Sequence, residues 1–318
     1  MAGASITIFT ASFNRAGLLA RLYQSILCQT RAPLEWIIVD DGSGDNTKAV
    51  VEGFVREGKI NILYHYQENS GKHRAINKGV EMASGELFFI VDSDDSLPVD
   101  SVETIAFFYN TFTGEEKQSF AGLSGLRATS EGVVGDYFPL PQGQSFTDMT
   151  YRELRGKYRI KGDKAEVYFT CVLKKFPFPF FEGESFLTEA VVWNGIAYRG
   201  YPLRWFNRII YSCEYLTGGL SDRLDQIASK NPQGMALFHN TNQRCWYNKK
   251  YSLYENYNYY YYCFLSGKTL WNSFRSDNCK LLAPLGILFG WVKKGKKKKP
   301  CKHHIKSLSI HSSFTPAS

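Results

Sequence analysis

Two kinds of apolar pattern alternate over the first 110 residues. Runs of apolar and β-branched residues, typical of strands buried on both faces, occupy residues 6–10, 36–39, 60–66 and 87–91. Apolar residues recur at helical spacing over 15–28, through Val50, Val51 and Phe54, and over 74–83. This alternation predicts a parallel sheet with helices on both faces. We therefore expect an α/β fold with a Rossmann-like, mostly parallel central sheet flanked by helices.

The pattern becomes less regular after residue 110. Residues 111–165 are rich in Gly, Ser and Thr and predict an irregular excursion, followed by a returning strand over 167–173 and a helix over 186–197. Eight tyrosines lie between Tyr247 and Tyr262, in a stretch compatible with a helix. We expect one large domain over residues 1–240, divided near residue 110. An aromatic-rich helical extension would follow over 241–292, and a basic, disordered tail over 293–318.

Polar clusters follow three of the four predicted strands. Ser12 and Asn14 follow the first, Asp40 and Asp41 the second, and residues 92–95, of sequence Asp-Ser-Asp-Asp, the fourth. Ligands of parallel sheets bind beyond the carboxyl ends of the strands, where these clusters would meet. The sequence therefore predicts one polar site at this edge of the sheet.

The acidic residues of segment 92–95 indicate a cation. Neighbouring carboxylates repel one another unless a cation neutralises them, and hard oxygen ligands favour Mg²⁺ or Mn²⁺, which also bind phosphate oxygens. The alternative is a solvated helix N-terminus, where the helix dipole favours acids. Segment 40–43 is also typical of a tight turn, although Asp41 there is suited to accept a hydrogen bond from a ribose or a pyrimidine. Phe13 either stacks on a base or belongs to the core.

Four segments resemble the motifs of family 2 glycosyltransferases of the GT-A fold. They are residues 10–15 (TASFNR), 37–43 (IIVDDGS), 69–77 (NSGKHRAIN) and 85–95 (GELFFIVDSDD). Their order and spacing match the family over about residues 4–110, and a weaker match extends to about residue 240. Two departures are Thr10-Ala11-Ser12, where Pro-Thr or Pro-Ser is commoner, and Lys72-His73-Arg74, in a loop that is usually small and apolar.

The resemblance implies that residues 1–110 bind a nucleotide sugar and that residues 111–240 bind the acceptor. The residues that would contact the donor are Ala11, Phe13, Asn14, Asp41, Lys72, Asp92 and Asp94. By the same resemblance Asp41 would face the base and Lys72 would approach the donor. Asp94 would contact the ribose or the metal. Asp95 would ligate the Mg²⁺ or Mn²⁺ that bridges the diphosphate and stabilises the charge of the leaving group.

The family also places an acid at the start of a helix in its second half, as the base that deprotonates the acceptor hydroxyl. Residues 181–190 (FEGESFLTEA) resemble this region in members that synthesise polysaccharides, and Glu189 aligns best with the base. Glu182 and Glu184 stay open as alternatives, since Gly195 stands where an arginine is usual. Such a glutamate is also compatible with a solvated helix N-terminus.

His239 is a further candidate from the same resemblance. It lies where some GT-A enzymes recruit a third metal ligand. A lone histidine beside Phe238 is more commonly a packing or surface residue, so we do not expect a ligand there.

The basic charge of the chain is concentrated at its C-terminus. The chain has 38 Lys+Arg and 30 Asp+Glu, a net charge of +8. Eight lysines and no acidic residue lie in 293–318, which leaves the first 292 residues neutral. A folded nucleic-acid-binding face would carry its basic residues on the globular part, so we expect no nucleic-acid partner.

The lysine cluster follows a twelve-residue apolar block, 281–292, that contains Pro, Gly and Trp. Such a block is too short to span a bilayer, but it suits insertion beside anionic headgroups. We expect an anionic membrane surface to be bound through residues 281–306; the alternative is a solvated basic tail after a packed helix. Seven cysteines without a CxxC pair, and no basic, apolar leader, favour a cytoplasmic protein, peripheral on the inner membrane face.

Three functions compete at this point. The first is an inverting, metal-dependent glycosyltransferase that moves a sugar from a nucleotide-diphosphate sugar, by family preference a UDP-sugar, to a polyprenyl-linked oligosaccharide or another cell-surface glycan. The second is a noncatalytic nucleotide-sugar-binding or scaffold subunit of a glycan-assembly complex. Nucleotidyl transfer is disfavoured because Ser12-Phe13-Asn14 follows the first strand, in place of a Gly-rich phosphate loop bearing Lys or Arg.

Overall fold

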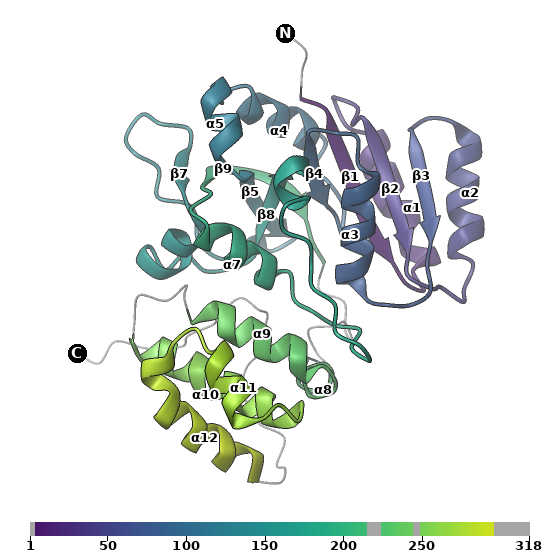
Figure 1. Ribbon diagram of the computed structural model, residues 1–318. Helices are drawn as coiled ribbons and strands as arrows, with labels where there is room; N and C mark the ends of the chain where they lie inside the picture. Colours follow the sequence, from purple (N-terminus) through teal and green to yellow (C-terminus); the bar gives the residue numbers. More distant parts are fainter. Residues whose placement is uncertain (1–3, 215–223, 244–248, 296–318) are drawn as a thin grey trace.

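One mixed sheet forms the centre of the protein. The computed structural model describes residues 4–214, 224–243 and 249–295 (Figure 1). The strands are β1 (Ile6–Ser12), β2 (Glu35–Asp40), β3 (Ile62–Tyr66), β4 (Leu87–Ile90), β5 (Gly122–Thr129), β6 (Gly132–Val133), β7 (Thr147–Met149), β8 (Lys164–Phe169) and β9 (Leu203–Ser212). Their order is β3-β2-β1-β4-β8-β5-β9-β7, with β6 paired to β5.

The direction of the strands changes at β8. Strands β1 to β4 are parallel, whereas β8 is antiparallel to both β4 and β5. Strand β9 runs parallel to β5, and the short β7 pairs antiparallel with β9. The predicted parallel sheet is confirmed for the first half of the chain, and the second half extends it as a mixed sheet.

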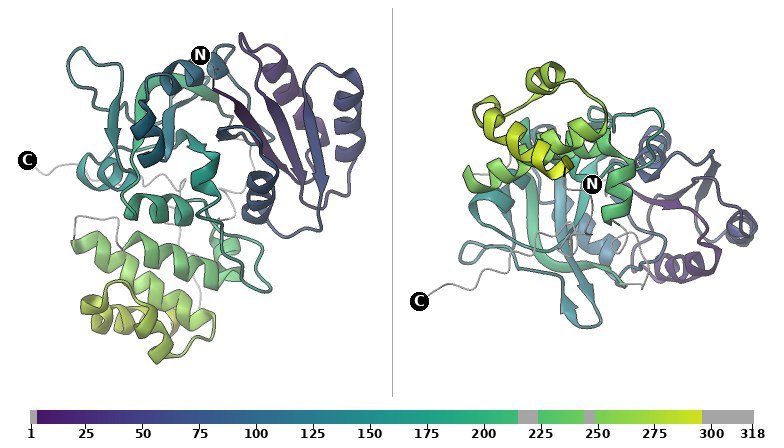
Figure 2. Two further views of the ribbon diagram at one scale, coloured as in Figure 1. Left: turned by 45° about the horizontal axis from the view of Figure 1, so that its top comes forward. Right: turned by 90° about the horizontal axis from the view of Figure 1, so that it is seen from below.

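Helices cover both faces of the sheet. Those of the first 200 residues are α1 (Ala16–Leu27), α2 (Thr47–Glu57), α3 (Lys72–Met82), α4 (Ser101–Tyr109), α5 (Gly114–Ser119), α6 (Thr170–Leu173) and α7 (Ala190–Tyr198), with a π-helical turn, η1 (Glu153–Lys157). Tyr23 of α1 stacks on Phe54 of α2 at 4.1 Å between ring centroids, and both rings lie over Trp36 of β2. Helix α3 packs on β1 and β2 from the opposite face (Figures 1 and 2).

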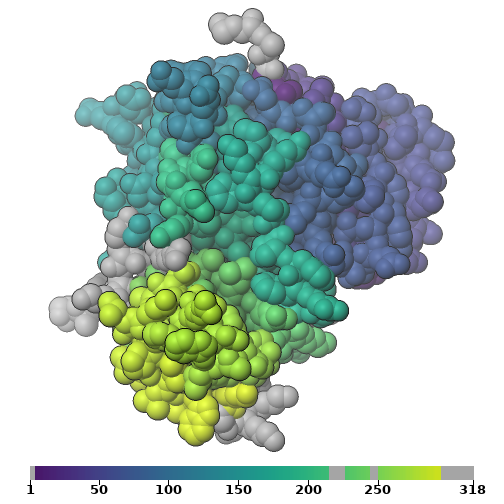
Figure 3. All heavy atoms as spheres, viewed as in Figure 1, coloured from purple at the N-terminus to yellow at the C-terminus, as the bar shows by residue number. Residues whose placement is uncertain are grey.

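A helical layer lies beside the sheet portion. It consists of α8 (Leu224–Lys230), α9 (Pro232–Asn242), α10 (Lys249–Leu265), α11 (Leu270–Ser276), the 3-10 turn η3 (Lys280–Leu282) and α12 (Ala283–Gly295). Figure 3 shows this layer as a lobe of its own, and the strands β1 to β3 point toward its side of the molecule in Figure 1. Helix α9 contacts both α7 and α10, so it joins the two parts. It also runs across residue 240, where the sequence suggested a boundary.

Helix α12 packs closely on α10 through small residues. A Cβ atom at Gly286 would lie 1.9 Å from the Asn256 side chain, and one at Gly290 would lie 2.8 Å from the Tyr261 backbone nitrogen. Lys293 Nζ donates a hydrogen bond to Asn258 Oδ1 at 2.8 Å. The predicted apolar block is therefore a packed helix, and its first lysine is folded back onto α10. No helix within the described ranges is long and apolar enough to cross a membrane.

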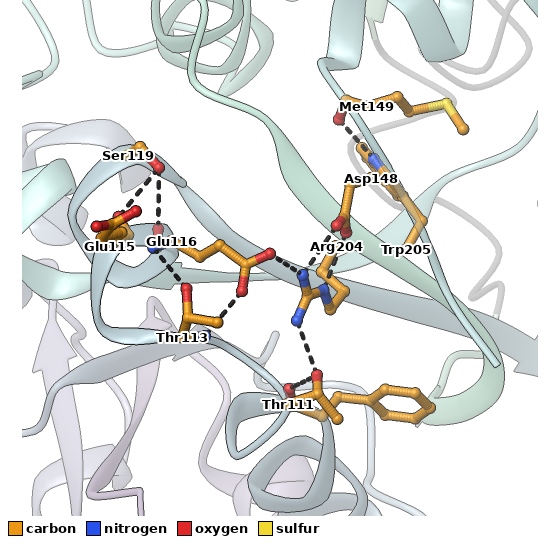
Figure 4. A network of polar contacts seen from close by, with 10 residues as sticks. Thr111, Thr113, Glu115, Glu116, Ser119, Asp148, Met149, Arg204 and Trp205 are labelled. Carbon is orange, nitrogen blue, oxygen red and sulfur yellow. Dashed lines mark hydrogen bonds and ion pairs between the residues drawn. The ribbon is translucent and has the colours of Figure 1, made fainter. Parts of the chain in front are cut away.

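A buried arginine holds the far end of the sheet together (Figure 4). Arg204 of β9 donates hydrogen bonds to both carboxylate oxygens of Asp148, at 2.9 and 2.8 Å, and to Glu116 at 2.9 Å. Its third partner is the Thr111 hydroxyl, at 2.9 Å. Glu116 also closes the capping box of α5 with Thr113, so this network connects α5, β7 and β9.

Three predicted elements differ from the structure. Residues 122–129, inside the predicted irregular excursion, form the central strand β5, because its glycines lie where neighbouring backbone and rings approach closely. The predicted strand over 167–173 ends at Phe169, and the remaining residues form α6. The helix predicted from 186 begins at Ala190, so residues 181–189 form a loop in front of α7.

Candidate active site

The ends of β1 and β2 form one side of the candidate site. Phe13, directly after β1, exposes 48% of its side chain, and Asn14 adopts a positive φ of 54°. Asn14 binds the next loop along the sheet edge, because its Oδ1 accepts a hydrogen bond from the Gly44 amide at 2.8 Å. Ala11, the last predicted residue of this strand, is partly buried against the core. The ring of Phe13 is thus held at the sheet edge with one face available to a ligand.

Asp41 fastens the loop that leads into α3. Its Oδ1 accepts hydrogen bonds from Gln67 Nε2 at 2.7 Å and from the Ser70 amide at 2.9 Å, while its Oδ2 accepts from the Gly71 amide at 2.8 Å. The carboxylate is buried, so these donors replace the water that it would otherwise bind. The contact that Asp41 was expected to make with a nucleoside base stays a prediction.

Helix α3 begins at the site with a cation. Lys72 is its first residue, and Lys72 Nζ lies 2.6 Å from Asp92 Oδ1 and 2.8 Å from Glu189 Oε1. Burial acts to lower the pKa of the Lys72 ammonium, but the charges of Asp92 and Glu189 outweigh burial and raise it above its ordinary value. The lysine therefore joins the donor half of the chain to the loop before α7. The ion pair with Glu189 connects residues 117 positions apart.

The acidic segment 92–95 follows β4. Asp92 faces Lys72; burial acts to raise the pKa of its carboxyl, and the lysine charge more than offsets burial and lowers it. Asp95 is buried, and its Oδ2 accepts a hydrogen bond from the Tyr211 hydroxyl at 2.6 Å. Burial, followed by the charge of Asp92, raises the pKa of Asp95 to about 6. An acid held in this way gains stability from a nearby cation.

Asp94 lies between these two acids in the sequence, and its carboxylate makes no hydrogen bond or ion pair to the described residues. Among those residues, no three His, Cys, Asp or Glu side chains are grouped closely enough to hold an ion by themselves. Mg²⁺ commonly uses one or two carboxylates and completes its shell with phosphates and water. The unpaired Asp94 beside Asp95 fits that kind of site.

The structure separates the three candidate bases. Glu184 accepts hydrogen bonds from the amides of Gln233 at 2.7 Å and Gly234 at 2.8 Å, so its carboxylate is bound to the start of α9. Glu182 is exposed in the loop. Glu189 alone of the three pairs with Lys72, beside Asp92. The residue that aligned best in sequence is thus the one that reaches the acidic segment.

Two residues at the site escaped sequence reasoning. Tyr211 of β9 donates to Asp95 and accepts a hydrogen bond from the Asp92 amide at 2.9 Å, which fixes the acidic segment. The Arg127 guanidinium lies 4.1 Å from the centroid of the Tyr211 ring. Both belong to strands of the second half, where no motif marks them. The pairing of β9 with β5 would have been the only signal.

His239 lies away from the acidic segment, in the helical layer. Its Nδ1 is 2.6 Å from Glu255 Oε2, and its ring stacks on Tyr262 at 5.3 Å between centroids. The histidine is buried and takes part in packing α9 against α10. The possibility of a third metal ligand at this position is therefore wrong for the described structure.

Comparison with known proteins decides the family. Residues 7–111 match the sequence model of Glycosyl transferase family 2. The chain belongs to glycosyltransferase family 2 through this segment. The matched residues contain Phe13, Asp41, Lys72 and the acidic segment, and they leave out Glu189 and the helical layer.

Two relatives show the extent of the sequence match. The glycosyltransferase GlyG of Streptococcus pneumoniae is 34% identical over 101 residues, which are 31% of this chain and 33% of GlyG. The GalNAc(5)-diNAcBac-PP-undecaprenol beta-1,3-glucosyltransferase of Campylobacter jejuni is 32% identical over 101 residues, again 31% of this chain and 33% of the relative. The chain thus matches about a third of the length of either relative.

Solved structures resemble the fold over most of the chain. S. aureus TarS 1–349 in complex with UDP superposes with a TM-score of 0.57 at 17% identity, covering 91% of this chain and 88% of that one. The mannosyltransferase PcManGT of Pyrobaculum calidifontis, in complex with GDP-Man and Mn²⁺, gives a TM-score of 0.55 at 14% identity, covering 93% and 88%. The GT-A fold predicted from the family 2 motifs is confirmed.

Proposed function

We propose that the chain is an inverting, metal-dependent glycosyltransferase that moves a sugar from a nucleotide-diphosphate sugar, first of all a UDP-sugar, to a lipid-linked oligosaccharide or another cell-surface glycan. The observation that carries the proposal is Lys72, whose ammonium lies between Asp92 of the donor half and Glu189 of the loop before α7. One carboxylate at the rim of the donor site is what an inverting transfer needs from its base.

The donor would lie across the ends of β1 and β2 and the start of α3. Phe13 offers an exposed ring for a nucleobase, and aromatic rings stack on bases without selecting a particular one. The diphosphate would approach the N-terminus of α3, where free amides and the helix dipole favour anions. Lys72 adds a positive charge at the same place. Donor binding would then compete with Asp92 and Glu189 for the lysine.

Asp94 and Asp95 would hold the Mg²⁺ or Mn²⁺ ion. When bound, the ion stabilises the charge that develops on the nucleoside diphosphate as it leaves. Tyr211 keeps Asp95 in place from behind through its hydroxyl. The relatives support the rest of the proposal: PcManGT was solved with a nucleotide sugar and Mn²⁺, TarS with UDP, and the Campylobacter enzyme is named for a lipid-linked acceptor.

Glu189 would deprotonate the acceptor hydroxyl. Before the acceptor arrives, its ion pair with Lys72 holds the carboxylate at the donor edge. Release of Lys72 to the diphosphate would leave Glu189 free to accept a proton. General bases of this kind contribute roughly 10²–10⁴-fold to the rate.

The experiment is a transfer assay with purified protein, Mn²⁺ and a panel of UDP-, GDP- and dTDP-sugars, in the presence of membrane lipid extracts as acceptor source. Wild type should release nucleoside diphosphate from one donor, and Asp95→Ala should release none. A noncatalytic subunit would bind a nucleotide sugar, detected by a rise in Tm, but give no product from any donor. Full Mn²⁺-dependent turnover by Asp95→Ala would contradict the metal assignment.

The membrane surface is the second part of this proposal. Leu285, Leu288, Phe289 and Val292 recur at helical spacing on α12 and are all exposed, which defines the outer face of α12. The lysines that follow carry no acidic neighbour in the sequence, and each would add about 1 kcal/mol near an anionic leaflet. An apolar face beside a basic cluster is suited to a lipid surface, where a lipid-linked acceptor would also lie.

Flotation with vesicles that contain phosphatidylglycerol tests this surface. Leu288→Glu should reduce the bound fraction, whereas Phe107→Glu, a change at an equally exposed apolar residue of α4, should leave it unchanged. Binding should weaken with added salt because the lysine contribution is screened. Equal flotation of the two variants would remove the outer face of α12 from the proposal.

A further inference from the structure

The loop before α7, residues 181–189, is bound to the helical layer by a carboxylate. Helix α9 begins with amides that have no partner within the helix. Glu184 accepts hydrogen bonds from two of them, those of Gln233 and Gly234. A negative charge at a helix N-terminus is also favoured by the helix dipole. The contact therefore fixes the middle of the loop to the first turn of α9.

Asn231 makes a second contact at the same place. Its Oδ1 accepts hydrogen bonds from the Ser185 amide at 2.9 Å and from the Phe186 amide at 3.0 Å. Its Nδ2 donates to the Ile227 carbonyl at 2.7 Å, so the side chain is itself held by α8. Asn231 is buried. Loop amides that would otherwise lack partners are thus satisfied from the helical layer.

The opposite side of the loop lies against the donor half. A Cβ atom at Gly71 would come within 1.9 Å of the Ser185 carbonyl oxygen. Gly71 immediately precedes Lys72, the partner of Glu189. The loop is therefore held between the start of α3 and the start of α9, and a shift of either helix would move it.

A buried chain of side chains connects α7 to the other end of α9. Asn194 lies on α7, five positions after Glu189, and its Nδ2 donates to Asn242 Oδ1 at 2.9 Å. Asn242 Nδ2 donates to Glu255 Oε1 at 3.1 Å, and Glu255 Oε2 lies 2.6 Å from His239 Nδ1. All four side chains are buried. Helix α7 is thus bound to α9 and α10 by directional contacts as well as by apolar packing.

Apolar packing alone would hold α9 against α7 without selecting one register. Buried polar groups tolerate few arrangements, because each misplaced group loses its partner in a medium of low dielectric. Two sets of such contacts, one before Glu189 and one after it, fix the segment that carries the base. Their common element is α9.

We propose that α9 is the positioning element for Glu189, and that Glu184 is the residue through which it acts most directly. The proposal rests on the proposed function, in which Glu189 is the base. Displacement of a catalytic group by about 1 Å can cost on the order of 10²-fold in rate. The donor contacts at Phe13 and Asp41 come from strand ends that make no described hydrogen bond to α9, so donor affinity should not depend on Glu184.

The test compares Glu184→Ala and Glu184→Gln with Gln233→Ala. The control removes an exposed side chain at the same contact and keeps the backbone amide that Glu184 binds. We expect kcat to fall about 10- to 100-fold in Glu184→Ala, with the donor KM and the UDP-induced Tm shift unchanged, and to fall less in Glu184→Gln, which keeps one acceptor oxygen. Gln233→Ala should equal wild type.

Three outcomes overturn the inference. The first is an unchanged kcat in Glu184→Ala, and the second is a parallel loss of kcat and UDP binding, which indicates general unfolding. Glu189→Gln serves as the benchmark: if it stays fully active, the proposed base is wrong, whereas inactive Glu189→Gln with active Glu184→Ala contradicts only the role of α9. Hydrogen exchange of residues 185–193 is read without any activity, and exchange in Glu184→Ala no faster than in Gln233→Ala is the third outcome.

Discussion

Replacement of Arg204 by Met should unfold the protein at a clearly lower temperature. The arginine side chain exposes only 2% of its surface, and the change leaves Asp148 and Glu116 without their cation. Removing one partner of a buried ion pair typically costs about 3–5 kcal/mol. Here the two carboxylates stay 31% and 29% exposed, so water relieves part of the loss, and we expect about 3 kcal/mol. The guanidinium also packs on the rings of Phe112 and Phe146, at 4.1 and 4.0 Å.

Calorimetry of Arg204→Met and Arg208→Met provides the comparison. Arg208 lies on the same strand and pairs with Asp100 at 2.8 Å, but the two side chains are 61% and 38% exposed. Exposed ion pairs contribute at most about 1 kcal/mol. With roughly 2–4 °C per kcal/mol for a chain of this size class, Tm should fall by about 6–12 °C in Arg204→Met and by far less in Arg208→Met. Equal Tm shifts in the two variants would refute the reasoning.

Three further predictions concern the site. Because burial raises the pKa of Asp95 to about 6, metal-free wild type should lose unfolding free energy relative to Asp95→Asn as pH rises from about 4 to about 6, by at most about 3 kcal/mol, and parallel pH curves in urea unfolding would contradict this. Gly71→Ala, at φ 98° and against Ser185, should reduce sugar transfer, while Gly58→Ala, at φ 64° with open space around it, should cost only about 1 kcal/mol of stability; similar transfer rates in both would argue against the packed loop. Tyr211→Phe should weaken the Mn²⁺ dependence of turnover by about 10- to 100-fold in metal affinity, and an unchanged Mn²⁺ titration would show that the hydroxyl does not support Asp95.

The donor half could be predicted from the sequence because its signals are local. Continuous apolar strands, helices at regular spacing and polar residues at strand ends all lie within a few positions of one another, and parallel strands bring their carboxyl ends to one edge. Phe13, Asp41 and the acidic segment lie at that edge as expected. Asp41 was understood less well, since its hydrogen bonds to the loop before α3 depend on backbone positions that no pattern reveals.

The acceptor half was harder to predict because its signals are not local. Strand β5 contains glycines at positions where Arg208 and Phe206 approach its backbone, and these contacts come from a strand some 80 residues away in the sequence. Tyr211 has no neighbour in sequence that marks it as a partner of Asp95. Likewise, the distinction between Glu184 and Glu189 depends on α9, which the sequence did not place against this loop.

The rate of sugar transfer by Glu189→Gln, measured beside its affinity for the donor, tests the central claim most directly. Gln keeps the size of the side chain and one hydrogen-bond acceptor but cannot take up a proton at neutral pH. We predict a loss of roughly 10²–10⁴-fold in kcat with the UDP-induced Tm shift retained, and a product whose anomeric configuration in wild type is inverted relative to the donor. A variant that transfers sugar at the wild-type rate, or a wild-type product with retained configuration, would contradict the assignment of Glu189 as the base of an inverting transfer.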